Sequence, residues 1–103
     1  METKEQIMTA SLLKHENFGN PISEKLSNYL RAHTSKDDRA NVAITTGVGT
    51  STIRNVVFRS NTLTEDNSKA IVELVKVAIE NCQKSIGEES QAMKALKEIL
   101  IEQ

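Results

Sequence analysis

Residues 39–58 read RANVAITTGVGTSTIRNVVF, and they give the strongest indication of the fold. Two glycines divide it into two short segments whose apolar residues recur at helical spacing. Gly47 can end the first helix, because glycine readily adopts the left-handed backbone found at many helix ends. Thr50 or Ser51 can cap the second helix through a hydroxyl group. The stretch therefore predicts two short helices that meet at a tight corner.

Small and branched side chains are spaced so that this corner can pack. Ala43 lets the second helix approach the first closely, and Val48 can plug the corner. Ile53 and Val56 would anchor the second helix to a core. The remaining residues of this helix, and the aromatic residue that follows it, then face outward: Thr50, Ser51, Arg54, Asn55 and Phe58.

A helix is also predicted on the N-terminal side of the corner. Asn20 can cap it and Pro21 can take its first position, where no backbone N–H is needed. The helix would run to about His33, and after a polar run Asp37 can cap the first helix of the corner. Its apolar side chains share one face: Ile22, Leu26, Tyr29 and Leu30.

The longest predicted helix follows the corner. Residues 64–67 are polar and acidic, as the first turn of a helix prefers. Gly87 predicts a break, after which a last helix runs to the end. Ile99, Leu100 and Ile101 are consecutive and cannot all point inward, so an exposed apolar patch should mark a partner surface. The stripe of the longest helix consists of Ile71, Leu74, Val75, Ala78, Ile79 and Cys82.

Composition agrees with a small helical protein. The chain has 103 residues, with 38% hydrophobic and 26% charged residues, one proline and four glycines. This is enough for one domain and favours helices over short strands with frequent turns. We expect an all-α fold, a compact bundle of about five helices. Residues 1–14 would form a frayed or docked arm, 15–84 the main domain, and 85–103 a C-terminal helix for packing or dimerisation.

Nothing in the sequence predicts an enzyme. Cys82 is the single cysteine and is most simply core filling, while His15 and His33 suit polar surface positions. The string GVGTST lacks the Gly-Lys-Ser/Thr ending of a phosphate-binding loop and has no strand before it. We expect no catalytic residues, metal, cofactor or small-molecule ligand.

The sequence also lacks membrane and export signals. No apolar stretch reaches the roughly 18 to 20 residues that a membrane span requires. The start, METKEQIMTASLL, has neither the basic head nor the uninterrupted apolar run of a signal peptide. We expect a cytoplasmic protein that makes no membrane contact.

Charge is distributed unevenly along the chain, although the net charge is −1. Residues 14–60 hold seven lysines and arginines against four acidic residues, a net charge of +3, and include all four arginines. Residues 61–103 hold five lysines against eight acidic residues, a net charge of −3. The middle segment is therefore the part expected to meet an acidic partner.

Residues 39–58 resemble the helix-turn-helix of bacterial and phage repressors, with matching residues at Ala43, Gly47, Val48, Ile53 and Val56. The resemblance to the lactose-repressor headpiece extends over about residues 39–75. The helix predicted at 21–33 makes the arrangement more similar to lambda-repressor-like domains of five helices. Two positions differ from the pattern, because Ile44 replaces a polar residue that normally faces solvent, and Gly49 replaces the usual Ser cap.

The resemblance implies sequence-specific binding to double-stranded DNA by a transcriptional regulator. Its second motif helix would enter the major groove. Arginine and asparagine suit guanine and adenine edges respectively. The implied base contacts come from Thr50, Ser51, Arg54 and Asn55. The implied phosphate contacts come from Lys36, Arg39, Arg59, Thr64 and Lys69.

A single domain of this type contacts few base pairs, so we expect a homodimer formed through the C-terminal helices. Its interface would use the exposed apolar patch, which Val72 and Val77 extend. The alternative is a helical protein-interaction module, such as an adaptor or antitoxin-like partner, that keeps the corner only for packing. Positive potential over residues 50–59 would favour DNA binding, whereas an acidic or apolar surface there would favour the module.

Overall fold

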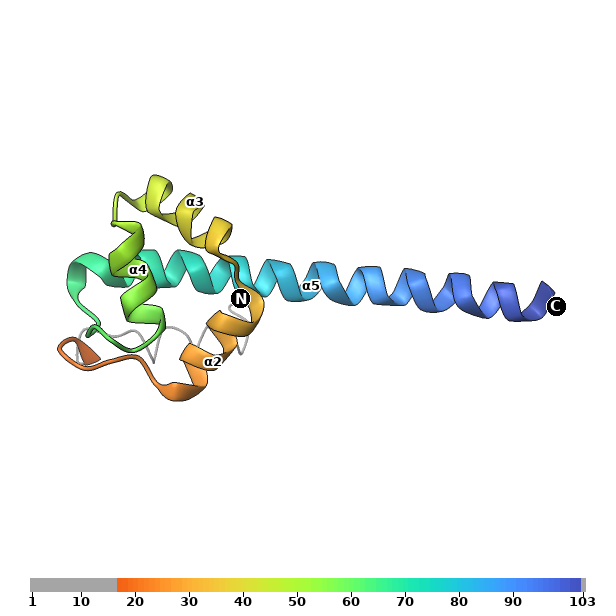
Figure 1. The fold of residues 1–103 in the computed structure, drawn as a ribbon, viewed down its shortest axis with the longest axis horizontal. Helices are drawn as coiled ribbons and strands as arrows, with labels where there is room; N and C mark the ends of the chain where they lie inside the picture. Colours follow the sequence, from red (N-terminus) through yellow and green to blue (C-terminus); the bar gives the residue numbers. More distant parts are fainter. Residues whose placement is uncertain (1–16, 103) are drawn as a thin grey trace, which may run out of the picture.

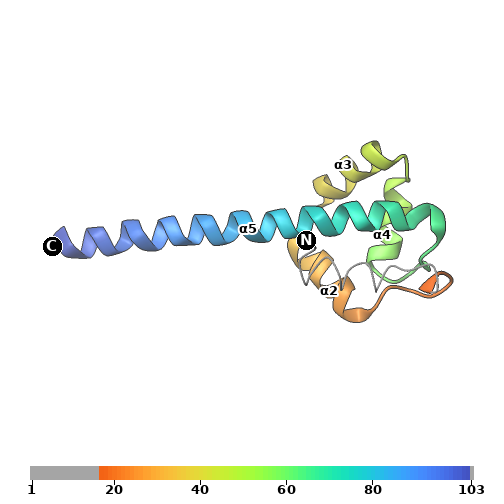
Figure 2. The ribbon, with the colours of Figure 1, turned by 180° about the vertical axis from the view of Figure 1, so that it is seen from behind.

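The computed structural model describes residues 17–102, which form four helices and no strand over that range. They are α2 (Glu24–His33), α3 (Lys36–Thr46), α4 (Thr50–Val57) and α5 (Glu65–Glu102). The three short helices pack around the first half of α5, and its second half projects away from them (Figures 1 and 2). The all-α prediction is confirmed, with four described helices where about five were expected. The predicted arm, residues 1–14, and His15 lie outside the described range.

The starts of α2 and α3 differ from the predicted ones. Ser23, not Asn20, caps α2 and accepts a hydrogen bond from the Leu26 N–H at 3.1 Å. The chain stays extended beyond Asn20 because the Asn20 carbonyl accepts the Leu63 N–H at 2.8 Å. Before α3, the Ser35 hydroxyl and the Asp38 carboxylate each accept the other residue's N–H, at 3.1 and 2.9 Å. This reciprocal capping box satisfies two amides, whereas the predicted Asp37 cap would satisfy one.

The corner between α3 and α4 is a three-residue turn. Gly47 ends α3 as predicted, with φ 76° and ψ 6°, and its N–H donates to the Ala43 carbonyl at 2.9 Å. Gly49 takes the cap position of α4 and offers no side-chain hydrogen bond. The prediction that Thr50 or Ser51 caps α4 is therefore wrong, because the short turn already places both inside its first turn.

The core lies between α5 and the other three helices. Leu30, Ile53, Leu63, Ile71 and Leu74 are each at most 1% exposed. Ala43 and Val48 pack half-buried against this core, as the corner requires. The other buried apolar residues are Ile22, Leu26, Val42, Val56, Val57, Ala70, Val75 and Ala78.

One predicted core residue of α2, Tyr29, is 54% exposed. The buried stripe of this ten-residue helix is narrow, with Leu26 and Leu30 one turn apart. Ser27 flanks it in place of Tyr29. The buried hydroxyl of Ser27 donates to the Val57 carbonyl at 2.6 Å, which joins α2 to the end of α4.

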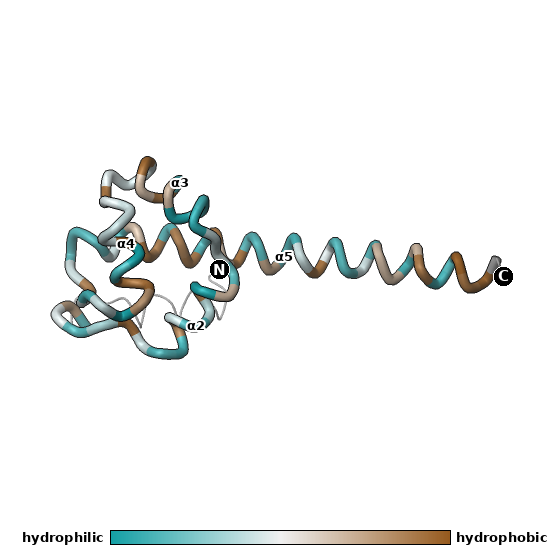
Figure 3. The backbone as a smooth tube through the Cα atoms, in the orientation of Figure 1, coloured by the Kyte–Doolittle hydropathy of each residue, from teal (hydrophilic) through white to brown (hydrophobic). Residues whose placement is uncertain are grey.

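Helix α5 continues through Gly87, where a break was predicted. Its 38 residues correspond to a length of about 57 Å, and the molecule measures 60 Å along its longest axis. Glycine costs a helix about 1 kcal/mol, and good helix formers on either side offset that cost. Hydrophobic bands recur along the projecting half (Figure 3), yet residues 83–101 are all exposed. No helix within residues 17–102 combines the length and apolar character needed to cross a membrane.

Candidate nucleic-acid interface

Helix α4 has one buried face and one polar face, as predicted. Ile53, Val56 and Val57 are completely buried. Thr50, Ser51 and Arg54 are exposed, and Asn55 is half-buried. The backbone carbonyl of Asn55 accepts the Ser60 and Asn61 N–H groups at 2.8 and 3.1 Å, which closes the end of the helix.

Three arginines from three helices gather around Phe58, directly after α4. The guanidinium carbons of Arg31 on α2, Arg39 on α3 and Arg54 on α4 lie 5.5, 5.9 and 4.8 Å from the centre of the Phe58 ring. The ring itself is 40% exposed. We call these four residues the Arg–Phe58 cluster. It brings together two predicted contacts, Arg39 and Arg54, and adds Arg31.

No carboxylate within residues 17–102 forms an ion pair with the three cluster arginines, although the charge of Arg39 acts on nearby Asp38. Within residues 17–102 the ion pairs are Arg59 with Glu24 and Lys76 with Glu73. None of the three cluster arginines takes part in them. Arg31 donates instead to the neutral side-chain oxygen of Asn28. Lys36, predicted to contact phosphate, is exposed one turn before Arg39 on α3.

The other three residues predicted to contact phosphate, Arg59, Thr64 and Lys69, are not part of the cluster. Arg59 adopts a left-handed backbone, with φ 64°. Its Nε donates to the Ile22 carbonyl at 2.8 Å and its Nη1 lies 3.3 Å from Glu24. The Thr64 hydroxyl accepts the Asn67 N–H at 3.2 Å and so caps α5. Lys69 is exposed on α5. These residues lie outside the Arg–Phe58 cluster, and two of them hold the fold together.

A shallow hollow of about 240 Å³ lies beside the cluster. Arg31 and Phe58 form part of its wall, and Ser27 lines it next to its hydrogen bond with the end of α4. Among the described residues that line it, the one acidic side chain is Glu24, which is the partner of Arg59. The hollow is therefore bordered by two arginines and one already paired carboxylate.

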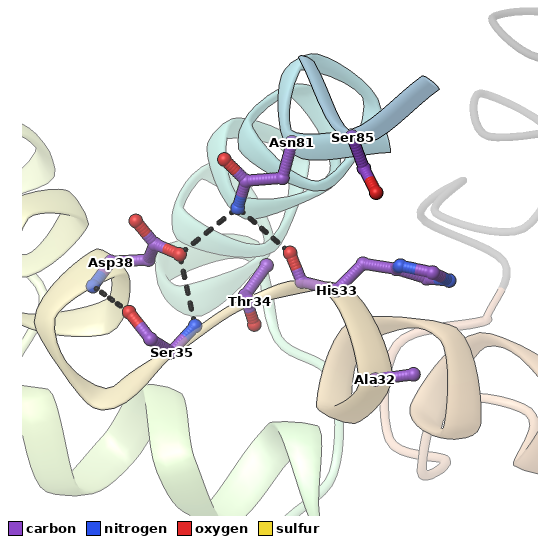
Figure 4. A pocket seen from close by; sticks show the side chains of 7 residues that line it. All are labelled: Ala32, His33, Thr34, Ser35, Asp38, Asn81 and Ser85. Atoms are coloured by element: carbon purple, nitrogen blue, oxygen red, sulfur yellow. Dashed lines mark hydrogen bonds between the residues drawn. The ribbon is translucent and has the colours of Figure 1, made fainter. Parts of the chain in front are cut away.

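A second hollow, of about 360 Å³, lies where the α2–α3 junction meets α5 (Figure 4). The Asn81 side-chain amide donates to the His33 carbonyl at 2.8 Å and to the Asp38 carboxylate at 3.1 Å. The pKa of Asp38 is lowered, chiefly by the hydrogen bond from the Ser35 backbone N–H, while burial acts in the opposite direction and raises the pKa. Asn81 and Arg39 lower the pKa further. These bonds fix α3 against α5 and so hold the start of the corner in place.

The sequence pattern indicates no role for Arg31 and places Phe58 only among the outward-facing residues. The available signal was the concentration of all four arginines within residues 14–60. It could not show which of them meet. Among the described residues no group of histidine, cysteine or acidic side chains is arranged to hold a metal ion.

Comparisons with known proteins add no family. No protein-family model matches the chain, and no curated protein or solved structure matches it.

Proposed function

We propose that the protein binds double-stranded DNA sequence-specifically, as a bacterial or phage-type transcriptional regulator. Helix α4 enters the major groove, where Thr50, Ser51, Arg54 and Asn55 contact base edges. Lys36 and Arg39 contact phosphates on one side of the groove. Such a target implies a cytoplasmic location.

The observation that carries this proposal is the position of the polar face of α4 beside arginines that form no ion pair within residues 17–102. Ser51 and Arg54 are exposed on a helix whose opposite face is buried by Ile53 and Val56. Arg39 from α3 converges on the same ring as Arg54. A rigid helix that presents polar side chains next to positive charge suits a polyanion with readable base edges.

The geometry of the corner supports the same proposal. Gly47 has a left-handed backbone, and only three residues separate α3 from α4. A helix-turn-helix that reads DNA joins its helices by a similarly short turn, often with glycine. The long helix α5 then forms the base on which both helices pack.

Two copies would join through the projecting half of α5. Val72, Ile79, Ile86, Met93 and Leu100 recur every seven residues, which is the repeat of a coiled coil. Cys82, Glu89 and Leu96 also lie seven residues apart, each three residues after a member of the first set, and so form the second column of the coiled-coil seam. Ile86, Met93, Leu96 and Leu100 are each at least 55% exposed.

This apolar seam is continuous with the core. Val72 and Ile79, at the start of the seam, are half-buried and pack against the core. Further along α5, no described residue covers the seam. A second copy can cover the seam without disturbing the bundle. It also supplies a second α4, as a two-fold DNA site requires.

A helical protein-interaction module is the second candidate. The observation that favours it is Ile44, which is 84% exposed on α3 close to the corner. An apolar side chain there suits a protein surface better than a phosphate backbone. The unpaired arginines favour DNA, so the module ranks second.

Titration of fluorescently labelled mixed-sequence duplex DNA with the full chain at several salt concentrations tests the proposal. We expect binding that weakens steeply with salt, because phosphate contacts release condensed counterions. Selection from random duplexes should then yield a preferred two-fold site. Absence of binding at low salt by the folded protein would reject DNA binding and favour the interaction module.

A further inference from the structure

The Arg–Phe58 cluster is more than a surface accumulation of charge. Its three guanidinium groups come from α2, α3 and α4, yet each lies within 6 Å of one ring centre. Three like charges gathered around one ring repel one another. The face of the aromatic ring attracts cations and offsets part of that repulsion. A bound anion would neutralise the repulsion that remains between the three arginines.

We infer that Phe58 is a platform that holds Arg31 and Arg39 ready to bind phosphate groups of a nucleic-acid backbone. The inference rests on the proposed function and extends it to a helix outside the corner. Arg54, on α4, contributes positive charge to the same place and remains a base contact. Phosphate suits the site because a guanidinium group presents a planar fork of N–H donors that matches phosphate oxygens.

The backbone that carries the ring is held in position by hydrogen bonds. The Phe58 N–H donates to the Arg54 carbonyl at 2.9 Å, and the neighbouring Val57 carbonyl accepts the buried Ser27 hydroxyl at 2.6 Å. On its other side, Arg59 is tied to the Ile22 carbonyl at 2.8 Å. The backbone around the platform is therefore linked to α2, the helix that supplies Arg31.

Neither of the acidic side chains near the cluster, Glu24 and Asp38, forms an ion pair with its arginines within residues 17–102. Glu24 lines the adjacent hollow but pairs with Arg59 at 3.3 Å. Arg31 has a neutral partner, Asn28. The guanidinium groups of Arg31 and Arg39 thus keep N–H donors for an incoming anion.

The test measures how duplex affinity depends on salt in full-length variants. On a plot of log affinity against log salt, Arg31→Ala should reduce the slope by about 0.9, the value for one lost phosphate contact. The double variant Arg31→Ala/Arg39→Ala should reduce it by about twice as much. Lys84→Ala is the matched control, since it removes an exposed cation from α5 and should leave the slope unchanged.

A second variant tests the platform itself. Phe58→Leu keeps an apolar side chain but removes the aromatic face. We expect affinity to fall about two- to fivefold, the equivalent of one exposed cation–π contact, with little change in slope. Unchanged affinity would overturn the role of the ring. Circular dichroism and thermal unfolding confirm that each variant is folded.

Failure of this inference can be told apart from failure of DNA binding. If the natural sequence binds duplex and Arg31→Ala keeps its slope, the phosphate site is wrong and the proposed function stands. If no duplex binds, NMR titration with inorganic phosphate decides the matter. Shifts of the Arg31 and Arg39 Nε–H signals with phosphate, but not with chloride at equal ionic strength, would support an anion site. Their absence would overturn it.

Discussion

The side-chain amide of Asn81 lies 3.1 Å from the carboxylate of Asp38 and joins the middle of α5 to the first turn of α3. The same amide group donates to the last carbonyl of α2, that of His33, at 2.8 Å. One side chain therefore sets the positions of two helices relative to the long one. Because α3 leads directly into α4, the placement of the candidate DNA-reading helix depends on this junction.

Asn81→Ala should destabilise the bundle by about 1–2 kcal/mol, because two hydrogen bonds are lost and their acceptors turn to solvent. For a domain of this size, each kcal/mol lowers the unfolding midpoint by about 4–8 °C. Thermal unfolding followed by circular dichroism measures the change. Gln83→Ala, at an exposed position two residues further along α5, is the control. Equal midpoints for the two variants would show that the junction contributes nothing.

The Asp38 carboxylate should contribute to stability in a pH-dependent way. Its pKa is lowered from 3.8, chiefly by the Ser35 backbone N–H, so the folded state favours the ionised form. The contribution is present above pH 3.8 and is lost as the pH falls through the lowered pKa of the folded state. In urea unfolding, the stability difference between the natural sequence and Asp38→Asn should shrink as the pH falls from about 4 towards about 2. A difference that stays constant over this range would contradict the prediction.

Replacing Arg59 by alanine and by glycine should change the stability of the protein by different amounts. Its left-handed backbone, with φ 64°, costs a residue with a side chain about 1 kcal/mol more than it costs glycine. Arg59→Ala loses the bond to the Ile22 carbonyl and keeps the strain, whereas Arg59→Gly loses the bond and relieves the strain. We expect the glycine variant to be the more stable of the two by about 1 kcal/mol in chemical unfolding. A glycine variant no more stable than the alanine variant would contradict this account.

The projecting half of α5 should control dimerisation without affecting the bundle. Leu96→Glu places a charge on the seam and should give a monomer, since Leu96 is 62% exposed and does not support the core. Glu89→Leu should tighten the dimer, because it replaces the one charged residue within the seam. Gln91→Glu, off the seam, is the control.

Sedimentation equilibrium measures the association. A monomer of the natural sequence at concentrations on the order of tens of micromolar would refute the dimer. Truncation after Gly87 should also give a monomer, with the stability of the bundle nearly unchanged, because residues 88–101 are exposed.

Base reading and phosphate contact should separate by their effects on specificity. Arg54→Ala and Asn55→Ala should each cost about 1–3 kcal/mol on the preferred duplex and relax the base preference. Lys36→Ala should weaken binding to all sequences alike. Competition binding with single-base variants of the selected site measures both quantities. If Arg54→Ala left affinity and preference unchanged at normal stability, α4 would not lie in the groove.

Local chemistry alone determined the helical class and the corner. Left-handed backbone at Gly47 and the buried face formed by Ile53 and Val56 both follow from short-range rules, namely glycine's freedom at positive φ and the helical repeat. The exposed polar side of α4 follows from the same repeat. That Ile99, Leu100 and Ile101 cannot all be buried was also predictable, because three consecutive helical residues cannot share one face. All three are exposed because this half of α5 projects from the bundle (Figure 1).

Features that require contacts between residues far apart in the chain can be seen only in the tertiary structure. Ser27 meets Val57 across 30 positions, and Asn81 meets His33 across 48. No local pattern encodes such pairings, so the exposure of Tyr29 and the meeting of three arginines at Phe58 appear only in the folded chain. The caps at Ser23 and Ser35 are local features, because each hydroxyl accepts an N–H three residues further along. The continuity of α5 through Gly87 likewise depends on local helix energetics and not on contacts between distant residues. Within residues 17–102 nothing packs against Gly87, and the small local cost of glycine is outweighed by the helix on both sides.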